Sequence, residues 1–353
     1  MPSYSRSQIV TAGQVGFYHC VARCVRRAYL CGAEQATGKS FEHRKEWVES
    51  RLARLAKSMA VDICGFAVMS NHIHLVVRIR PDVAASWSAE EVVRRWWKLF
   101  GGRRDGQEQA ASPSAAERAA LLADPERVET LRQRLADLSW FMRSLCEPIA
   151  RRANREDGCT GRFWEGRFKS QALLDEAAIL ACSIYVDLNP IRAGIAKTPE
   201  TSRHTSAARR IEARKRRARR RKLAAAGTTD VPVSKLSPSP SAAWLCRLSL
   251  QPGQELPSSK KKGFLEMSLT QYLKLLDWTG RQIRRGKRGS IPAHLAPIFE
   301  RLRIDDAKWV TTVKTLGRTF HRAVGRAESL MAKAATSGLR WIAGMSGSRA
   351  AFG

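Results

Sequence analysis

The first 200 residues are predicted to form an α+β fold, with an antiparallel sheet and helices on one of its faces. Three observations predict this fold class. Runs of aromatic and β-branched residues indicate strands, and apolar residues spaced three or four apart indicate helices. The two kinds of segment follow one another as β-α-β-β-α-β-α, with a long insertion before the second helix.

The first four elements come from local patterns. Residues 15–25 are rich in aromatic and β-branched side chains and predict a strand. Residues 41–59 carry apolar side chains at helical spacing. Two further strands are expected at 61–69 and 72–79, and the short polar break Ser70-Asn71 between them suits a hairpin turn.

The remaining elements of this region follow the insertion. Residues 82–137 combine helical segments with a loop rich in Gly, Ser and Pro, and residues 138–154 predict an amphipathic helix. Residues 161–174 indicate a loop and a strand. Asp175 is a suitable N-cap for a helix that we expect to end near Leu188, because Asn189-Pro190 follows.

A change of composition near residue 200 predicts three parts. Residues 1–200 form the α+β domain, residues 201–262 form a basic, disordered linker, and residues 263–353 form a basic, mainly helical C-terminal domain that binds DNA. The linker prediction rests on the basic run at 209–222 and on a Ser-, Pro-, Gly- and Lys-rich stretch. Helical periodicity returns at 267–278 and at 305–333.

The charge of the chain indicates a polyanionic partner. Lys and Arg number 62 against 32 Asp and Glu, which gives a formal net charge of +30. Such an excess favours nucleic acid. No apolar run of membrane-spanning length and no signal peptide occur, so we expect a cytoplasmic, nucleoid-associated bacterial protein without a membrane partner. The eight cysteines form no CxxC pairs and predict reduced thiols.

The hairpin carries a candidate metal site. His72 and His74 are two apart on a predicted strand, so both imidazoles point to the same face. Two neutral imidazoles suit a divalent metal that keeps open positions for substrate oxygens. The alternative is a pair of surface or hydrogen-bonded histidines without a ligand.

The last helix carries a candidate nucleophile. Tyr185 and Asn189 are four apart and therefore share one helix face. A phenol can attack a phosphate and form a covalent phosphotyrosine, which conserves bond energy for rejoining. The alternative is that Tyr185 packs in the core while Asn189 caps the helix before Pro190.

Three motifs together resemble a known family. The HIH of residues 72–74 preceded by MSN, the segment GRFWEGRFKSQ and the segment YVDLNPIRAG are similar to those of the HUH single-tyrosine transposases. The REP-associated tyrosine transposases, which are related to insertion-sequence-200-like enzymes, are the branch that this chain resembles. The resemblance covers residues 10–198 and excludes the C-terminal region. The long insertion departs from the small members of the family.

The resemblance implies a ferredoxin-like antiparallel sheet and a DNA-cleaving activity. It implies that His72 and His74 hold Mg²⁺ or Mn²⁺, with Asn189 as the third ligand in a position where a carboxylate would bind more strongly. It implies that Tyr185 forms a 5′-phosphotyrosine and leaves a free 3′-OH. The substrate would be single-stranded DNA with a hairpin or palindromic repeat, and the enzyme would act as a monomer or a homodimer.

Basic side chains near these motifs are candidates for DNA contacts. Before the tyrosine helix, basic and aromatic residues alternate, and they could hold phosphates and stack unpaired bases; a strand with buried aromatics is the alternative. The candidates are Arg162, Trp164, Arg167 and Lys169 before the helix, Arg192 after it, and Arg281, Arg284 and Arg285 in one C-terminal loop.

Two other function classes stay open. A domesticated relative would bind nucleic acid without cutting it. A rolling-circle or conjugative relaxase also uses two histidines, but it often carries a helicase domain. The sequence has no GxxxxGK[ST] motif for an ATPase and no GxSxG motif for a serine hydrolase.

Overall fold

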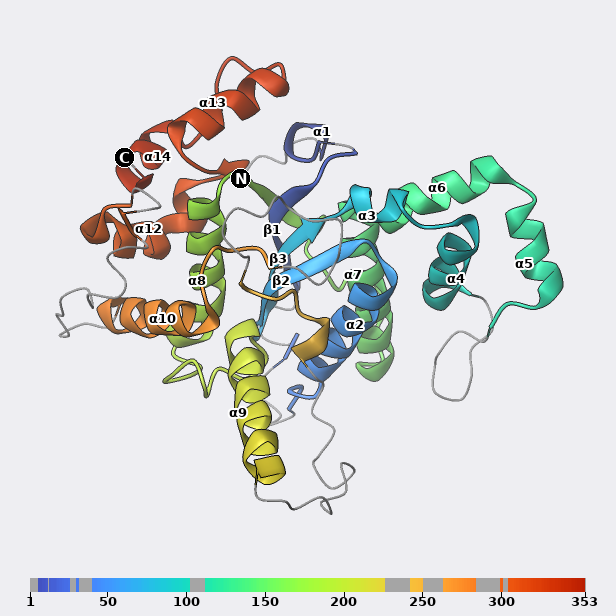
Figure 1. Cartoon of the computed structure of the whole chain (residues 1–353), viewed down its shortest axis with the longest axis horizontal. Coiled ribbons are helices and arrows are strands. Elements are labelled where there is room, and N and C mark those ends of the chain that lie inside the picture. Colours follow the sequence, from blue (N-terminus) through green and yellow to red (C-terminus); the bar gives the residue numbers. More distant parts are fainter. Residues whose placement is uncertain are drawn as a thin grey trace.

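A five-stranded sheet lies at the centre of the molecule (Figure 1). The computed structural model describes residues 6–11, 13–25, 30–31, 40–101, 112–225, 242–249, 263–283, 299–300 and 304–352. The strand order is β2-β3-β1-β4-β5. The strands are β1 (Gly16–Arg23), β2 (Val61–Val68), β3 (His72–Ile79), β4 (Lys169–Leu173) and β5 (Ala323–Val324).

The first four strands pair in antiparallel directions. β1 lies between β3 and β4, and β2 pairs with β3 at the edge. Helix α2 (Arg44–Ser58) connects β1 to β2, and α7 (Leu138–Glu156) connects β3 to β4. Each helix thus links two strands that do not pair with each other, in a split β-α-β arrangement. The predicted α+β class is confirmed.

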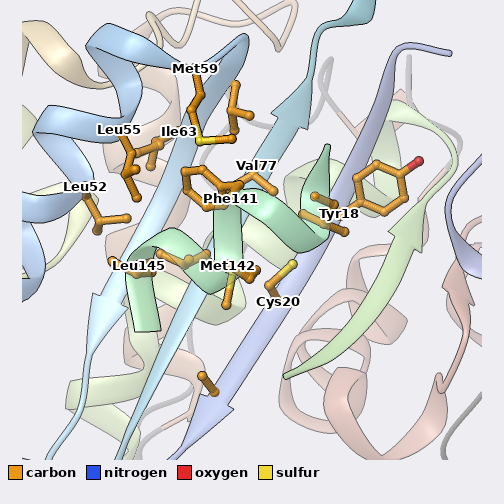
Figure 2. Packing of buried hydrophobic residues seen from close by; sticks show 14 of the residues in the cluster. Tyr18, Cys20, Leu52, Leu55, Met59, Ile63, Val77, Phe141, Met142 and Leu145 are labelled. Carbon is orange, nitrogen blue, oxygen red and sulfur yellow. The ribbon is translucent and has the colours of Figure 1, made fainter. Parts of the chain in front are cut away.

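One face of the sheet packs on α2 and α7. Figure 2 shows Leu52 and Leu55 of α2 and Phe141 of α7 close to Ile63 of β2 and Val77 of β3. All five side chains are fully buried. Burial of each such side chain contributes about 1.5–3 kcal/mol, so this layer is a main source of stability for the four-stranded sheet.

The opposite face packs on α8 (Glu176–Arg192), which corrects the prediction that helices cover one face only. In Figure 1, α8 lies on the left of the sheet, and α2 and α7 lie on its right. Every residue of β2 is buried, and so is every residue of β3 after His72. Strands without an alternating polar face need cover on both sides.

C-terminal segments cover α8 and extend the sheet. Helices α10 (Leu269–Ile283) and α12 (Asp306–Thr319) pack against α8, and β5 pairs in parallel with β4. After β5 come α13 (Ala327–Thr336) and α14 (Met345–Phe352). The predicted helical block 305–333 is therefore divided by a strand. The division of the chain into three domains stays a prediction, although side chains from both sides of residue 262 share one hydrophobic cluster.

The predicted linker contains ordered structure, which corrects that part of the interpretation. Residues Ser206–Ala225 form α9, and a short 3-10 helix, η2, follows at Ala242–Trp244. Arginine is a good helix former, and the start of α9 is anchored in the core, which explains why the basic run is helical. The stretches 226–241 and 250–262 lie outside the described residues.

The insertion forms a helical extension. It contains α3 (Pro81–Ala85), α4 (Ala89–Phe100), α5 (Ala115–Leu122) and α6 (Pro125–Leu135), and it projects away from α8 in Figure 1. Ser114 and Glu117 form a reciprocal capping box at α5, which fixes where that helix begins. A short helix, α1 (Arg6–Ile9), precedes β1.

Helix α8 begins as predicted but ends later. The Asp175 side chain caps it by accepting a hydrogen bond from the Ala178 N–H. The helix then continues through Pro190 to Arg192, although proline in a helix interior costs about 3 kcal/mol. Pro190 is buried, and the Asn189 amide donates to the Tyr185 carbonyl at 3.1 Å. These contacts stabilise the last turn.

Asp187 joins three helices at the core. Its carboxylate accepts hydrogen bonds from the Ser206 hydroxyl at 2.6 Å, from the Ala207 N–H at 3.0 Å and from the Tyr272 hydroxyl at 2.6 Å. Burial raises the pKa of this carboxyl, which shows how strongly it is desolvated. The side chain thus fixes the start of α9 and one face of α10 against α8.

Replacing Asp187 by Leu is expected to lower the free energy of unfolding by about 3 kcal/mol or more, because three buried donors lose their acceptor. Tyr272→Phe removes one of these bonds and should cost about 1–2 kcal/mol. Urea denaturation of both variants measures the difference. Equal stabilities of Asp187→Leu and the unchanged protein would contradict the assignment.

Candidate active site

The sheet register places polar side chains from three strands on the face covered by α8. His74 lies opposite Val21, and His19 lies opposite Gln171 on the next strand. His72 lies opposite Arg23. Side chains of directly opposed residues point to the same side of a sheet. Histidines from two strands and a glutamine from a third therefore meet beneath the tyrosine helix.

A chain of hydrogen bonds fixes the proton positions on two of these histidines. The backbone carbonyl of Phe320 can only accept, so the group that contacts it is the amide nitrogen of Gln171. The Gln171 oxygen therefore accepts from His19 Nδ1 at 2.9 Å. His19 Nε2 then accepts from His74 Nδ1 at 3.0 Å. In a neutral imidazole this leaves His74 Nε2 with a free lone pair.

His72 presents a second lone pair to the same point. Its Nδ1 lies 2.5 Å from the Asn71 side-chain oxygen, which is an acceptor, so the proton of a neutral His72 is on Nδ1. Its Nε2 lies 2.9 Å from His74 Nε2. Two lone pairs at this distance repel each other unless a cation lies between or beside them. The hydrogen-bond network therefore prepares both Nε2 atoms for a cation.

Burial keeps the histidines neutral. Desolvation lowers the pKa of His19 to about 4. Desolvation, with smaller contributions from Arg23 and His19, lowers the pKa of His72 to about 4 as well. The pKa of His74 is well below its ordinary value for the same main reason. Neutral imidazole is the form that binds metals.

The donor set fits a divalent metal in part. Two ligand atoms at about 2.1 Å from one ion, at right angles, are about 3.0 Å apart, and the two Nε2 atoms are 2.9 Å apart. No group of three His, Cys, Asp or Glu able to hold a metal ion occurs in the part of the chain that the structure describes. A metal here would need an amide, water or substrate oxygen to complete its coordination.

Tyr185 lies directly against the histidines. Its ring packs edge-on against His74 and His19, with centroids 5.6 Å and 5.9 Å apart. The Arg192 guanidinium lies 5.1 Å from the Tyr185 ring centroid, and it donates to the Lys314 carbonyl at 2.9 Å. The phenol predicted from one helix and the imidazoles predicted from one strand thus occupy the same site.

Helix α12 reaches the Tyr185 hydroxyl. A Cβ atom added to Gly317 would lie 3.0 Å from this oxygen, so glycine allows the close approach of the α12 backbone. The Phe320 carbonyl, just beyond the end of α12, holds Gln171 as described above. The C-terminal region therefore forms one wall of the site. No sequence pattern predicted this role.

Other tyrosines are less suited to act as nucleophiles. Tyr18 and Tyr272 are buried, whereas Tyr185 is half-buried. Burial raises the pKa of Tyr18 to about 12 and raises the pKa of Tyr272 well above its ordinary value. Tyr4 and Tyr29 lie outside the described residues. Among the described tyrosines, Tyr185 is the one with access to the histidine pair.

Asn189 lies one turn beyond Tyr185 and is half-buried. The contacts that the structure describes for its side chain are with the Tyr185 carbonyl, and none of them joins it to His72 or His74. Its assignment as third metal ligand stays a prediction.

In the segment before β4, the basic residues and the aromatic residue Trp164 differ in their exposure to solvent. Arg162, Arg167 and Lys169 are exposed, and the register places Lys169 on the strand position opposite Val21, level with His74. Trp164 is half-buried, packs on the core, and donates its indole N–H to the Cys146 carbonyl at 2.9 Å. The basic side chains are thus exposed, whereas Trp164 has a structural contact. Their DNA contacts stay a prediction.

Of the C-terminal candidates, the structure describes Arg281. Arg281 belongs to helix α10, not to a loop as predicted, and it is exposed and pairs with Asp277 at 2.8 Å. A helix is favoured there because α10 buries its apolar side against α8. Arg284 and Arg285 lie outside the described residues.

Sequence reasoning missed four residues of the site: His19, Arg23, Gln171 and Gly317. His19 is a polar residue within an apolar strand run, and this is the one local pattern that could have marked it. Arg23 lies close enough to His72 to lower its pKa. Gln171 and Gly317 depend on contacts between segments about 130 to 150 residues apart, which no local pattern contains.

Replacing Gln171 by Met should lower the affinity for Mn²⁺ by about tenfold to 100-fold, because the bond that sets the His19 and His74 protons is lost. Titration calorimetry with Mn²⁺ measures this effect in the absence of any substrate. Gln133→Met, on the exposed surface of α6, is the matched control. An unchanged affinity in the Gln171 variant would show that the chain of hydrogen bonds does not position His74.

Comparison with protein-family models and with curated proteins gave no match. One solved structure, of a REP-associated tyrosine transposase bound to a REP hairpin, is similar over 60% of this chain and 86% of that chain. The sequence identity is 12% and the TM-score is 0.35. At these values the similarity decides neither the family nor the activity. None of the described helices is long and apolar enough to cross a membrane.

Proposed function

We propose that this chain is a metal-dependent, single-tyrosine DNA nickase and strand transferase of the HUH type. The substrate would be single-stranded DNA with a hairpin or a palindromic repeat. The four antiparallel strands have the order of a ferredoxin-like sheet, as the motif resemblance implies. The proposal does not rest on the remote structural similarity.

One observation carries the proposal: the half-buried Tyr185 ring lies against His74, whose Nε2 faces His72 Nε2 at 2.9 Å. The proposed reaction requires that a phenol from one helix and two imidazoles from a strand meet at a single phosphate. Side chains packed at random in a core would not combine this contact with a hydrogen-bond chain that frees both Nε2 atoms.

Each side chain has a distinct task in the proposed reaction. His72 and His74 would hold Mg²⁺ or Mn²⁺, which when bound neutralises phosphate oxygens and orients the scissile bond. The Tyr185 hydroxyl oxygen bonds to phosphorus while the bond from phosphorus to the 3′ oxygen breaks. The phenol loses its proton to solvent, and the released 3′ oxygen takes one up. The products are a 5′-phosphotyrosine and a free 3′-OH, so the reverse step rejoins the strand without a nucleotide cofactor.

Arg192 assists at the same position. Its guanidinium lies over the Tyr185 ring and close enough to His74 to contribute to the lowered pKa of that imidazole, so it would hold a phosphate oxygen of the bound strand. Lys169 and Arg23 lie on strand positions next to the histidines and are both exposed, so they would hold the flanking phosphates.

Labelled DNA tests the proposal. The protein is incubated with Mn²⁺ and a hairpin-bearing single strand that is labelled at either its 3′ end or its 5′ end, and the products are separated on a denaturing gel. A 5′-phosphotyrosine keeps the 3′ label on the protein and releases the 5′ label. Transfer of the 5′ label, or tight binding without any covalent product across a panel of hairpins, would contradict the proposal. The second outcome would favour a domesticated binding protein.

A further inference from the structure

A groove on the opposite side of the sheet is lined by arginines. It lies between α2 and α7, α4 of the insertion contributes to one wall, and its volume is about 890 Å³. The lining arginines are Arg51, Arg54, Arg143, Arg151, Arg152 and Arg155. Glu46 and Glu147 are the two acidic residues in the lining, so six positive charges and two negative ones leave a net charge of +4.

Aromatic rings form part of the groove. Trp47, Phe100 and Trp140 line it, and each is half-buried. The Arg152 guanidinium lies 4.0 Å from the centroid of Trp47, and that of Arg143 lies 5.2 Å from Trp140. Aromatic faces stack unpaired bases, and guanidinium groups beside them hold phosphates. The groove combines both kinds of contact.

The arginines of α7 follow the length of the groove. Arg143, Arg151, Arg152 and Arg155 are exposed. The rise of an α-helix places Arg143 and Arg155 about 18 Å apart along α7. This length corresponds to about five stacked nucleotides at about 3.4 Å each. Arg143 and Arg151 both pair with Glu147, which neutralises one of the two charges. The four arginines of α7 and Glu147 together leave a net charge of +3, which favours a polyanionic ligand.

We propose that this groove binds a segment of single-stranded nucleic acid outside the catalytic site. Positive charge alone would also suit an acidic peptide, but the three aromatic rings favour a ligand with flat bases. The α4 helix supplies Phe100 to the wall, so the insertion helps to build the groove. The inference requires no cleavage and therefore goes beyond the proposed function.

Charge removal in the groove tests the proposal. The groove variant combines Arg151→Gln, Arg152→Gln and Arg155→Gln. The control combines Arg118→Gln, Arg127→Gln and Arg340→Gln, which removes the same charge from exposed positions outside the groove. Both triple variants are made in full-length Tyr185→Phe protein and studied in EDTA, so that binding is measured without metal or covalent chemistry.

The probe is a labelled single strand of mixed sequence, about 30 nucleotides long and free of hairpins. We expect the groove variant to bind it about tenfold to 100-fold more weakly at about 0.1 M salt, and the salt slope to fall by about two. The control should stay within about threefold of the parent protein. An equal loss in both variants would overturn the proposal, because net charge alone would then explain binding.

Photo-crosslinking locates the bound strand independently of affinity. A probe that carries 5-bromodeoxyuridine should crosslink to peptides of α2 and α7, and it should fail to do so in the groove variant. Crosslinks confined to other elements would overturn the proposal. The proposal would also be overturned if poly-glutamate bound the parent protein as tightly as the DNA probe does and bound the groove variant with the same loss of affinity. That result would indicate an acidic peptide as the ligand.

Discussion

Tyr185→Phe is expected to abolish the covalent protein–DNA product while DNA affinity stays within about twofold, because the substitution removes one oxygen and keeps the ring. The ring contacts with His74, His19 and Arg192 do not involve the hydroxyl, so the site should keep its shape. Denaturing gels with 3′-labelled hairpin DNA measure the product, and titration of labelled DNA measures the affinity.

Tyr18→Phe is the matched control for this loss. It removes a phenol from β1, but Tyr18 is buried among α2 and α7 side chains, on the face of the sheet opposite α8. We expect the covalent product to persist in this variant. A product that persists in Tyr185→Phe and disappears in the control would contradict the nucleophile assignment.

His72→Ala is expected to weaken Mn²⁺ binding by at least about 100-fold, because one of two protein nitrogens is lost and the other cannot complete the site. His72 is half-buried, so its removal should leave the fold intact, whereas His74 is buried and bonded to His19. Cleavage should fall with metal binding. Electron paramagnetic resonance of free Mn²⁺ gives the bound fraction without any substrate.

His43→Ala controls for the general effect of removing a histidine. His43 is exposed and pairs with Glu156, away from the candidate site. Its removal should leave Mn²⁺ affinity unchanged. Retained Mn²⁺ binding in His72→Ala would mean that the two imidazoles serve as a hydrogen-bonded pair without a metal.

Local patterns predicted most elements of the fold. The sequence ranges for β1, β2, β3, α2 and α7 agree with the structure to within about three residues, because period-two and period-3.6 patterns are strong in these segments. The same patterns predicted that His72 and His74 point the same way. Their agreement with the structure follows from the geometry of a strand, which leaves little freedom for residues two apart.

Long-range packing explains what the sequence could not predict. The buried run of β2 indicates cover on both faces, but only the folded chain identifies α8 as that cover. The helical state of α9 depends on Asp187, which lies 19 residues before Ser206. The link from Phe320 through Gln171 and His19 to His74 joins four segments of the chain. Such contacts are set by topology, so no window of sequence contains them.

The attachment site of DNA on the protein tests the central claim most directly. After reaction with Mn²⁺ and hairpin DNA, nuclease digestion leaves a nucleotide remnant on the protein, and mass spectrometry of tryptic peptides locates it. The peptide of residues 170–192 contains Tyr185 and no other tyrosine. The account predicts the remnant on this peptide, at Tyr185. A remnant on any other residue would contradict it.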